Sequence, residues 1–120
     1  MDKQQLRQVW SRFASGVTVI TTLDSNNQVH GMTANALCSI SLDPPSALLS
    51  VGQQRATHSL IQNKRTFGVN ILTADQEVVA SYYAREKKDS PPPNGVAFWF
   101  TRQGTAILKG CLGYMDCRVV

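Results

Sequence analysis

The sequence predicts a single domain that is mainly β (α+β), an antiparallel barrel with a few short peripheral helices. Segments rich in β-branched residues recur along the chain, polar turns of the hairpin type join several of them, and helical periodicity is confined to short stretches. The 120 residues, of which 42% are hydrophobic, fit one domain spanning residues 1–120.

The first third of the chain predicts a helix followed by two strands. Residues 2–13 carry apolar side chains at helical spacing, and residues 16–23 are dense in β-branched side chains. The polar turn at 24–27 leads into a second strand, expected to run from 29 to 41, which is rich in small and polar residues. The sequence Asp-Pro-Pro at 43–45 ends it, because proline cannot donate to a strand ladder.

The remaining elements alternate between short strands and short helices. Thr73 and Gln76 have the spacing of a capping box, which predicts that a helix carrying Tyr82 and Tyr83 opens there. The other expected elements are strands at 46–52, 66–72, 96–101, 105–109 and 111–120, and a helix at 56–62. The last strand reaches the final residue, so we expect the barrel to lack its C-terminal strands.

Charge and cysteine patterns argue against several classes of function. The net charge is +4, but acidic residues interrupt the densest basic cluster, residues 85–89, so we expect no nucleic-acid binding. The positive net charge would still attract phosphate-bearing molecules. Three cysteines without Cys-x-x-Cys spacing predict reduced thiols and no metal site. With no secretory signal and no apolar run long enough to cross a bilayer, we expect a cytoplasmic protein that does not associate with membranes.

Sequence motifs for catalysis by side chains are missing. The chain has no Gly-x-Gly-x-x-Gly, no P-loop, no nucleophile elbow and no paired carboxylates. We therefore predict no catalytic side chain, and expect a cofactor to carry the chemistry of any enzymatic activity.

Small and polar side chains mark a first candidate binding segment, residues 31–45. Thr33, Asn35 and Ser39 offer hydrogen-bonding groups, while Ala34 and Ala36 allow a flat ligand to approach the backbone. An edge strand with a wet polar face explains the same residues equally well. Cys38 lies in this segment with no cation nearby in sequence, which favours a packed thiol over a redox thiol.

A second candidate segment, residues 53–59, lies at the start of a predicted helix. Helix N-termini bind phosphate through unpaired N–H groups, and Arg55 and Thr57 add donors there. Ordinary capping beside a surface arginine is the better explanation when this segment is taken alone. His30 and His58 are each candidates for a proton donor, but we expect His58 to be a binding group and a lone histidine to be structural.

Together, four stretches resemble the flavin reductase-like family of FMN-binding split barrels. They are residues 13–22, 31–36, 39–45, and 67–72 followed by Asp75-Gln76, in the family's order. The resemblance implies a split-barrel homodimer that binds FMN or FAD near the subunit interface. It also implies that NADH or NADPH passes a hydride to flavin N5, and that the reduced flavin supplies a partner monooxygenase.

The resemblance also assigns roles to individual residues. It places Thr33, Ala34, Asn35, Ala36, Cys38 and Ser39 beside the isoalloxazine ring and ribityl chain, Ser50, Val51, Gly52 and Gln53 along the same flavin, and Arg55, Thr57 and His58 at the phosphate, with Tyr83 and residues 85–88 over the tail. Ala36 departs from the serine of many relatives, and a later histidine-containing segment of the family has no counterpart. The alternatives are a flavin carrier or sensor without reductase activity and, on net charge alone, a nucleic-acid-binding barrel.

Overall fold

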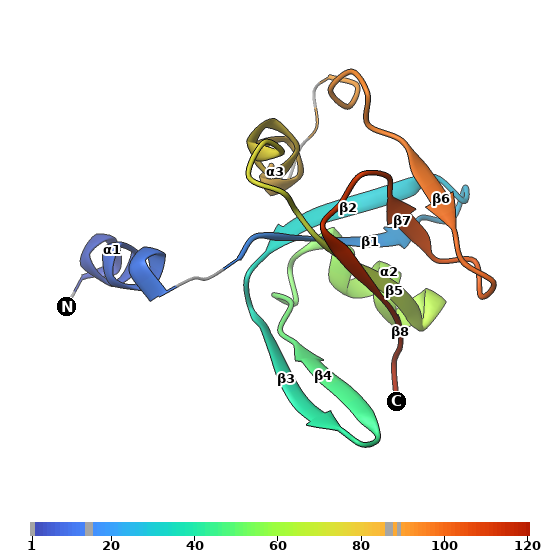
Figure 1. Cartoon of the computed structure of the whole chain (residues 1–120), viewed down its shortest axis with the longest axis horizontal. Coiled ribbons are helices and arrows are strands. Elements are labelled where there is room, and N and C mark those ends of the chain that lie inside the picture. Colours follow the sequence, from blue (N-terminus) through green and yellow to red (C-terminus); the bar gives the residue numbers. More distant parts are fainter. Residues whose placement is uncertain (1, 14–15, 86–87, 89) are drawn as a thin grey trace.

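The computed structural model describes residues 2–13, 16–85, 88 and 90–120, and it is mainly β (Figure 1). Three antiparallel sheets and three helices make up this part of the chain. The elements are α1 (Lys3–Phe13), β1 (Thr18–Leu23), β2 (Val29–Ala34), β3 (Leu37–Leu42), β4 (Pro45–Leu49), α2 (Ala56–Lys64), β5 (Thr66–Ile71), α3 (Glu77–Ala84), β6 (Phe98–Phe100), β7 (Ala106–Leu108) and β8 (Gly113–Arg118). The predicted fold class, mainly β and antiparallel with a few short helices, is confirmed.

A four-stranded sheet in the order β2-β1-β5-β8 forms the centre of the fold. Strand β1 is paired on both sides, so that Thr21 lies opposite Gly31 on β2 and Gly68 on β5. Two hairpins, β3-β4 and β6-β7, complete the set of strands. The second hairpin joins the central sheet through the Thr21 hydroxyl, which donates a hydrogen bond to the Ala106 carbonyl at 2.5 Å.

Apolar clusters cover both faces of the central sheet. Because side chains alternate along a strand, the neighbours Val19 and Ile20 on β1 belong to different clusters. Val19 packs with residues of α3 and β7, and Ile20 packs with β2, β5 and Ile61 of α2. Helices α2 and α3 are therefore held on opposite faces of β1.

One predicted strand is in fact two. The continuous strand expected at 29–41 is wrong, because β2 ends at Ala34 and β3 begins at Leu37. Asparagine is depleted in strands, and at Asn35 the chain leaves the central sheet to pair with β4 instead. The Ala36 carbonyl is satisfied by the N–H of Ser50, at 3.0 Å, which holds the new hairpin closed at its base.

The predicted capping box forms only in part. Gln76 Oε1 accepts a hydrogen bond from the Thr73 N–H at 2.8 Å, which is the return bond of such a box. The Thr73 hydroxyl bonds to the Asp75 carboxylate instead of a helix N–H, and α3 begins at Glu77. Residues 73–76 are thus a turn before the helix, not its first turn.

Candidate functional site

Two predicted segments lie side by side at the base of the β3-β4 hairpin. Asn35 and Ala36 are exposed in the connection between β2 and β3, and Ser50 is hydrogen-bonded to Ala36. Leu37 is paired with Leu49 on the neighbouring strand. The first candidate segment therefore meets residues 50–53, with Gly52 and Gln53 exposed in the connection to α2.

Arg55 lies at the start of α2, and its charge acts on Lys88. Arg55 is the residue before the helix, in an extended conformation, and its carbonyl accepts the His58 N–H at 3.1 Å. Lys88 follows α3 in the chain, and burial and the Arg55 charge lower its pKa. Like charges held near a helix N-terminus are stabilised by an anion. The phosphate site expected at Arg55 stays a prediction.

His30 connects β2 to the first turn of α2. Its Nε2 lies 3.0 Å from the Thr57 hydroxyl, and the Thr57 side chain is only 1% exposed. Burial lowers the pKa of His30, the Lys88 and Arg55 charges lower it further, and Asp24 opposes them. The hydroxyl of Thr57 is thus directed inward, toward His30.

Tyr83 and Thr33 fix α3 against β2. The Tyr83 ring is 3% exposed and packs directly on Gly31, where an added Cβ would lie 2.6 Å from ring carbon Cδ1. The Thr33 hydroxyl donates to the Ala80 carbonyl of α3 at 2.6 Å. Lys88 Nζ lies 5.9 Å from the centre of the Tyr83 ring, within cation–π range. The Tyr83 ring thus supports Lys88. Burial, followed by the neighbouring Tyr82, raises the pKa of Tyr83 to about 12.

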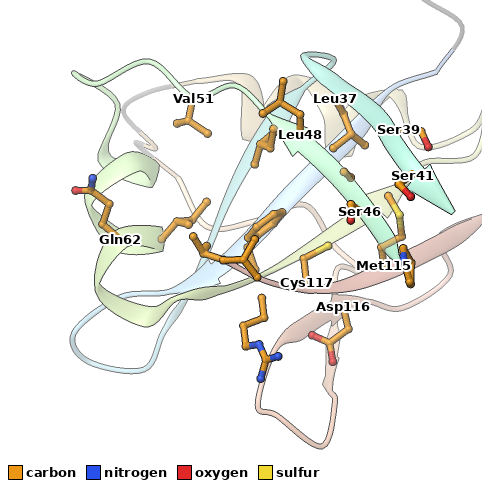
Figure 2. Close-up of a pocket in the computed structure, with 18 of the residues that line it drawn as sticks. Leu37, Ser39, Ser41, Ser46, Leu48, Val51, Gln62, Met115, Asp116 and Cys117 are labelled. Atoms are coloured by element: carbon orange, nitrogen blue, oxygen red, sulfur yellow. The ribbon is translucent and has the colours of Figure 1, made fainter. Parts of the chain in front are cut away.

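A cavity of about 1060 Å³ lies between the β3-β4 hairpin, α2 and β8 (Figure 2). Of the predicted site residues, Ser39, Val51 and His58 line it. Cys38 does not, because successive side chains on β3 point to opposite sides. Arg55 does not line the cavity either, so the predicted phosphate residue Arg55 and this cavity belong to separate surfaces.

The remaining site residue, Ala34, is half-buried at the end of β2 and packs against the cluster around Ile20. Sequence reasoning missed the pairing of His30 with Thr57, which lie 27 residues apart. No local pattern in the chain links a histidine on a strand to a hydroxyl on a later helix, so only the packing of α2 on β2 reveals it.

The part of the chain that the structure describes carries neither a metal-binding cluster nor a membrane-spanning helix. Within it, no group of three His, Cys, Asp or Glu side chains could hold a metal ion. Its three cysteines are unpaired. Among the described helices, none combines the length and the apolar character that spanning a bilayer requires.

The fold is an antiparallel β domain, and the predicted site residues gather at the base of the β3-β4 hairpin and around the start of α2. Residues 10–120 match the model of the flavin reductase like domain, and the chain belongs to this family. The predicted family is therefore confirmed.

Three relatives illustrate the similarity. An NADH-dependent flavin reductase of a Rhodococcus species is 41% identical over 117 residues, covering 96% of this chain and 64% of the relative. The reductase component of a 4-nitrophenol 4-monooxygenase/4-nitrocatechol 2-monooxygenase from Rhodococcus opacus is 35% identical, covering 100% and 63%. A structure of the NADH:FAD oxidoreductase SgcE6 from Streptomyces globisporus, with NAD and FAD fragments, has a TM-score of 0.84 at 33% identity, covering 99% and 70%. The chain thus spans just under two thirds of the length of these two curated relatives.

Proposed function

We propose that this chain belongs to an NAD(P)H-dependent flavin reductase, which transfers a hydride from NADH or NADPH to FMN or FAD. The observations that support the proposal are Arg55 at the start of α2 and Lys88, which lies over the Tyr83 ring. A flavin phosphate would neutralise both charges. The exposed connection at Asn35 and Ala36 would border the ring system, where small side chains allow the backbone to approach it.

The contribution of the protein to this reaction is binding and orientation. Hydride transfer needs the nicotinamide and flavin rings stacked within reach, and no proton-transferring side chain has to lie between them. One hydride and one proton convert the flavin to its reduced form, and NAD(P)⁺ leaves. This accounts for a site without a catalytic dyad.

The test is anaerobic reduction of flavin by the purified protein. FMN and NADH are added, and the visible absorbance of the flavin is followed, with FAD and NADPH as further arms. We expect bleaching at a rate proportional to protein concentration, and a much slower rate for Arg55→Ala at subsaturating FMN. Binding of flavin without protein-dependent bleaching would contradict reductase activity and indicate a carrier or sensor instead.

We further propose that the reduced flavin is passed to a partner monooxygenase. The support is the similarity to the Rhodococcus opacus protein, whose name describes the reductase component of a monooxygenase. The test is product formation when this protein, NADH and a flavin-dependent oxygenase are mixed, with catalase present to remove peroxide. Hydroxylation that requires this protein is the expected result.

We propose a split-barrel homodimer that works in the cytoplasm. On the β3-β4 hairpin Ile40, Leu42 and Leu48 are exposed by 60%, 89% and 59%, and a second subunit would bury such side chains. Free cysteines suit a reducing compartment. Sedimentation equilibrium should give twice the monomer mass, and Leu42→Asp should shift the protein toward the monomer.

A further inference from the structure

The connection between α3 and β6 ends in a tight turn formed by residues 93–96. The N–H of Val96 donates to the Pro93 carbonyl at 3.2 Å, and Gly95 has a φ of 87°, as the third position of a type II turn requires. Asn94 and Gly95 are both exposed. Apart from the chain neighbours of Gly95, no atom lies within 4 Å of the position that a Cβ on it would take, so nothing crowds this residue.

Asn94 differs from the other asparagines in its neighbour and in its bonding. It is the one asparagine in the sequence that a glycine follows. Asn70, by contrast, precedes Ile71, and hydrogen bonds in the buried core fix both ends of its side-chain amide. In the part of the chain that the structure describes, no hydrogen bond is found for the Asn94 side chain or for the N–H of Gly95. The carboxamide of Asn94 is therefore free to turn toward the next backbone nitrogen.

We propose that Asn94 is a site of spontaneous modification, at which the chain converts its own asparagine into aspartate and isoaspartate. The backbone nitrogen of Gly95 bonds to Cγ of Asn94 and closes a succinimide ring, while the Cγ–Nδ2 bond breaks and ammonia leaves with the proton of the attacking nitrogen. Water then opens the ring. Opening at the Cγ carbonyl gives aspartate, and opening at the main-chain carbonyl gives isoaspartate. Glycine favours the closure because it places no Cβ beside the attacking nitrogen.

The turn lies between two anchors that hold residues 90–96 against α3. At one end, the Tyr82 hydroxyl donates to the Ser90 carbonyl at 2.8 Å. At the other end, Val96 packs on the buried cluster that contains Tyr82 and Tyr83. In isoaspartate the main chain runs through the former side chain, which adds a methylene between these anchors. We infer that this form holds the segment on α3 less tightly, and that either product lowers the net charge of +4 by one unit.

The test is peptide mapping of the folded protein after prolonged incubation at mildly alkaline pH, beside a fresh sample digested in parallel. Trypsin releases residues 89–102, in which Asn94 is the only side-chain amide, and residues 56–64, which contain Asn63. We expect the first peptide to gain the mass that replacing NH2 by OH adds, and to separate into two forms. The second peptide, in which lysine follows the asparagine, should stay unchanged.

A synthetic peptide of residues 89–102 separates the effect of the fold from that of the local sequence. Because the turn is exposed and the Asn94 side chain is not hydrogen-bonded, the folded protein should convert at a rate similar to that of the peptide. Conversion of the peptide alone would overturn the inference, since the fold would then protect Asn94. Asn94→Gln should abolish both products, and a mass gain that persists in residues 89–102 of this variant would also overturn it.

A further measurement tests the weakened attachment to α3. The modified fraction, separated from the unmodified protein by ion exchange, should unfold at a lower temperature than the unmodified protein. Asn94→Asp is the matched control, because it carries the same charge on an ordinary backbone and should unfold close to the wild type. Equal unfolding temperatures for the modified fraction and Asn94→Asp would overturn the inferred loosening of residues 90–96.

Discussion

Asn70 on β5 receives the N–H of Leu108 on β7 at its side-chain oxygen, at 2.8 Å, inside the fully buried core. The amide nitrogen of the same side chain donates to the Val19 carbonyl at 2.9 Å and to Thr21 Oγ1 at 3.1 Å. One side chain therefore joins β1, β5 and β7. Within the described residues, every buried side-chain polar atom has a hydrogen-bond partner. Asn70 forms such hydrogen bonds where the central sheet meets the β6-β7 hairpin.

Asn70→Leu should lower the free energy of unfolding by roughly 2 to 4 kcal/mol, because it leaves the buried N–H of Leu108 without an acceptor. Chemical denaturation measures the loss. The matched control is Asn63→Leu on the exposed side of α2, which should change stability by less than about 0.5 kcal/mol. Equal effects of the two substitutions would contradict the bridging role of Asn70.

Gly31→Ala should destabilise the fold by about 1 to 3 kcal/mol, because the new Cβ overlaps the Tyr83 ring and forces α3 away from β2. Thermal unfolding followed by circular dichroism checks this. Gly16→Ala is the control, since an added Cβ at Gly16 meets no atom within 4 Å. A Gly31→Ala protein as stable as the wild type would show that Tyr83 does not press on β2.

Arg55→Ala should weaken FMN binding by roughly ten- to a hundredfold and riboflavin binding far less, because riboflavin lacks the phosphate. Arg55→Lys should fall between wild type and Arg55→Ala, since it keeps the charge and loses the fork of donors. Arg102→Ala, an exposed arginine between β6 and β7, serves as the control for loss of a positive charge. Equal losses for FMN and riboflavin would remove Arg55 from the phosphate site.

Tyr83 should lose its proton well above the pH at which a free tyrosine does, because its pKa is raised to about 12. Since the folded value lies above the unfolded value of 10.0, the associated stability is present below pH 10 and is lost as the pH rises toward 12. The tyrosinate absorbance of wild type and Tyr83→Phe measures this directly. The variant should lack the part of the wild-type titration near pH 12, and an unchanged titration curve would refute the assignment.

The fold class was predictable because β-branched segments and polar turns are local signals. The composition of residues 16–23 and 66–72 alone predicts strands, and the structure has β1 and β5 within them. The break at Asn35 was not predictable, because both sides of it are strand-like and only pairing with β4 decides where the chain turns. Residues 73–76 carry the sequence of a capping box and form a turn, because the Thr73 hydroxyl bonds to Asp75 and not to an N–H of the helix.

The candidate site was predictable in its segments and not in its contacts. The family resemblance placed Arg55 and Thr57 at the phosphate end, and these assignments remain predictions. What the sequence could not show is that the Thr57 hydroxyl is directed at His30, and that the Tyr83 ring supports Lys88. Both depend on helices α2 and α3 packing against β2, which involves residues far apart along the chain.

Neither hairpin pairs with a third strand within the described residues. The β6-β7 hairpin is held to the central sheet through Thr21 and Asn70, whereas no such side-chain hydrogen bond is found from the β3-β4 hairpin to that sheet in the same part of the chain. An isolated pair of strands is marginally stable, so its amide protons should exchange with solvent through local opening, at a lower free energy than those of β1 and β5. One wall of the proposed flavin site thus has less cooperative protection than the central sheet. A ligand bound there would slow exchange first in the hairpin, so that deuterium uptake along residues 37–49 would report on occupancy.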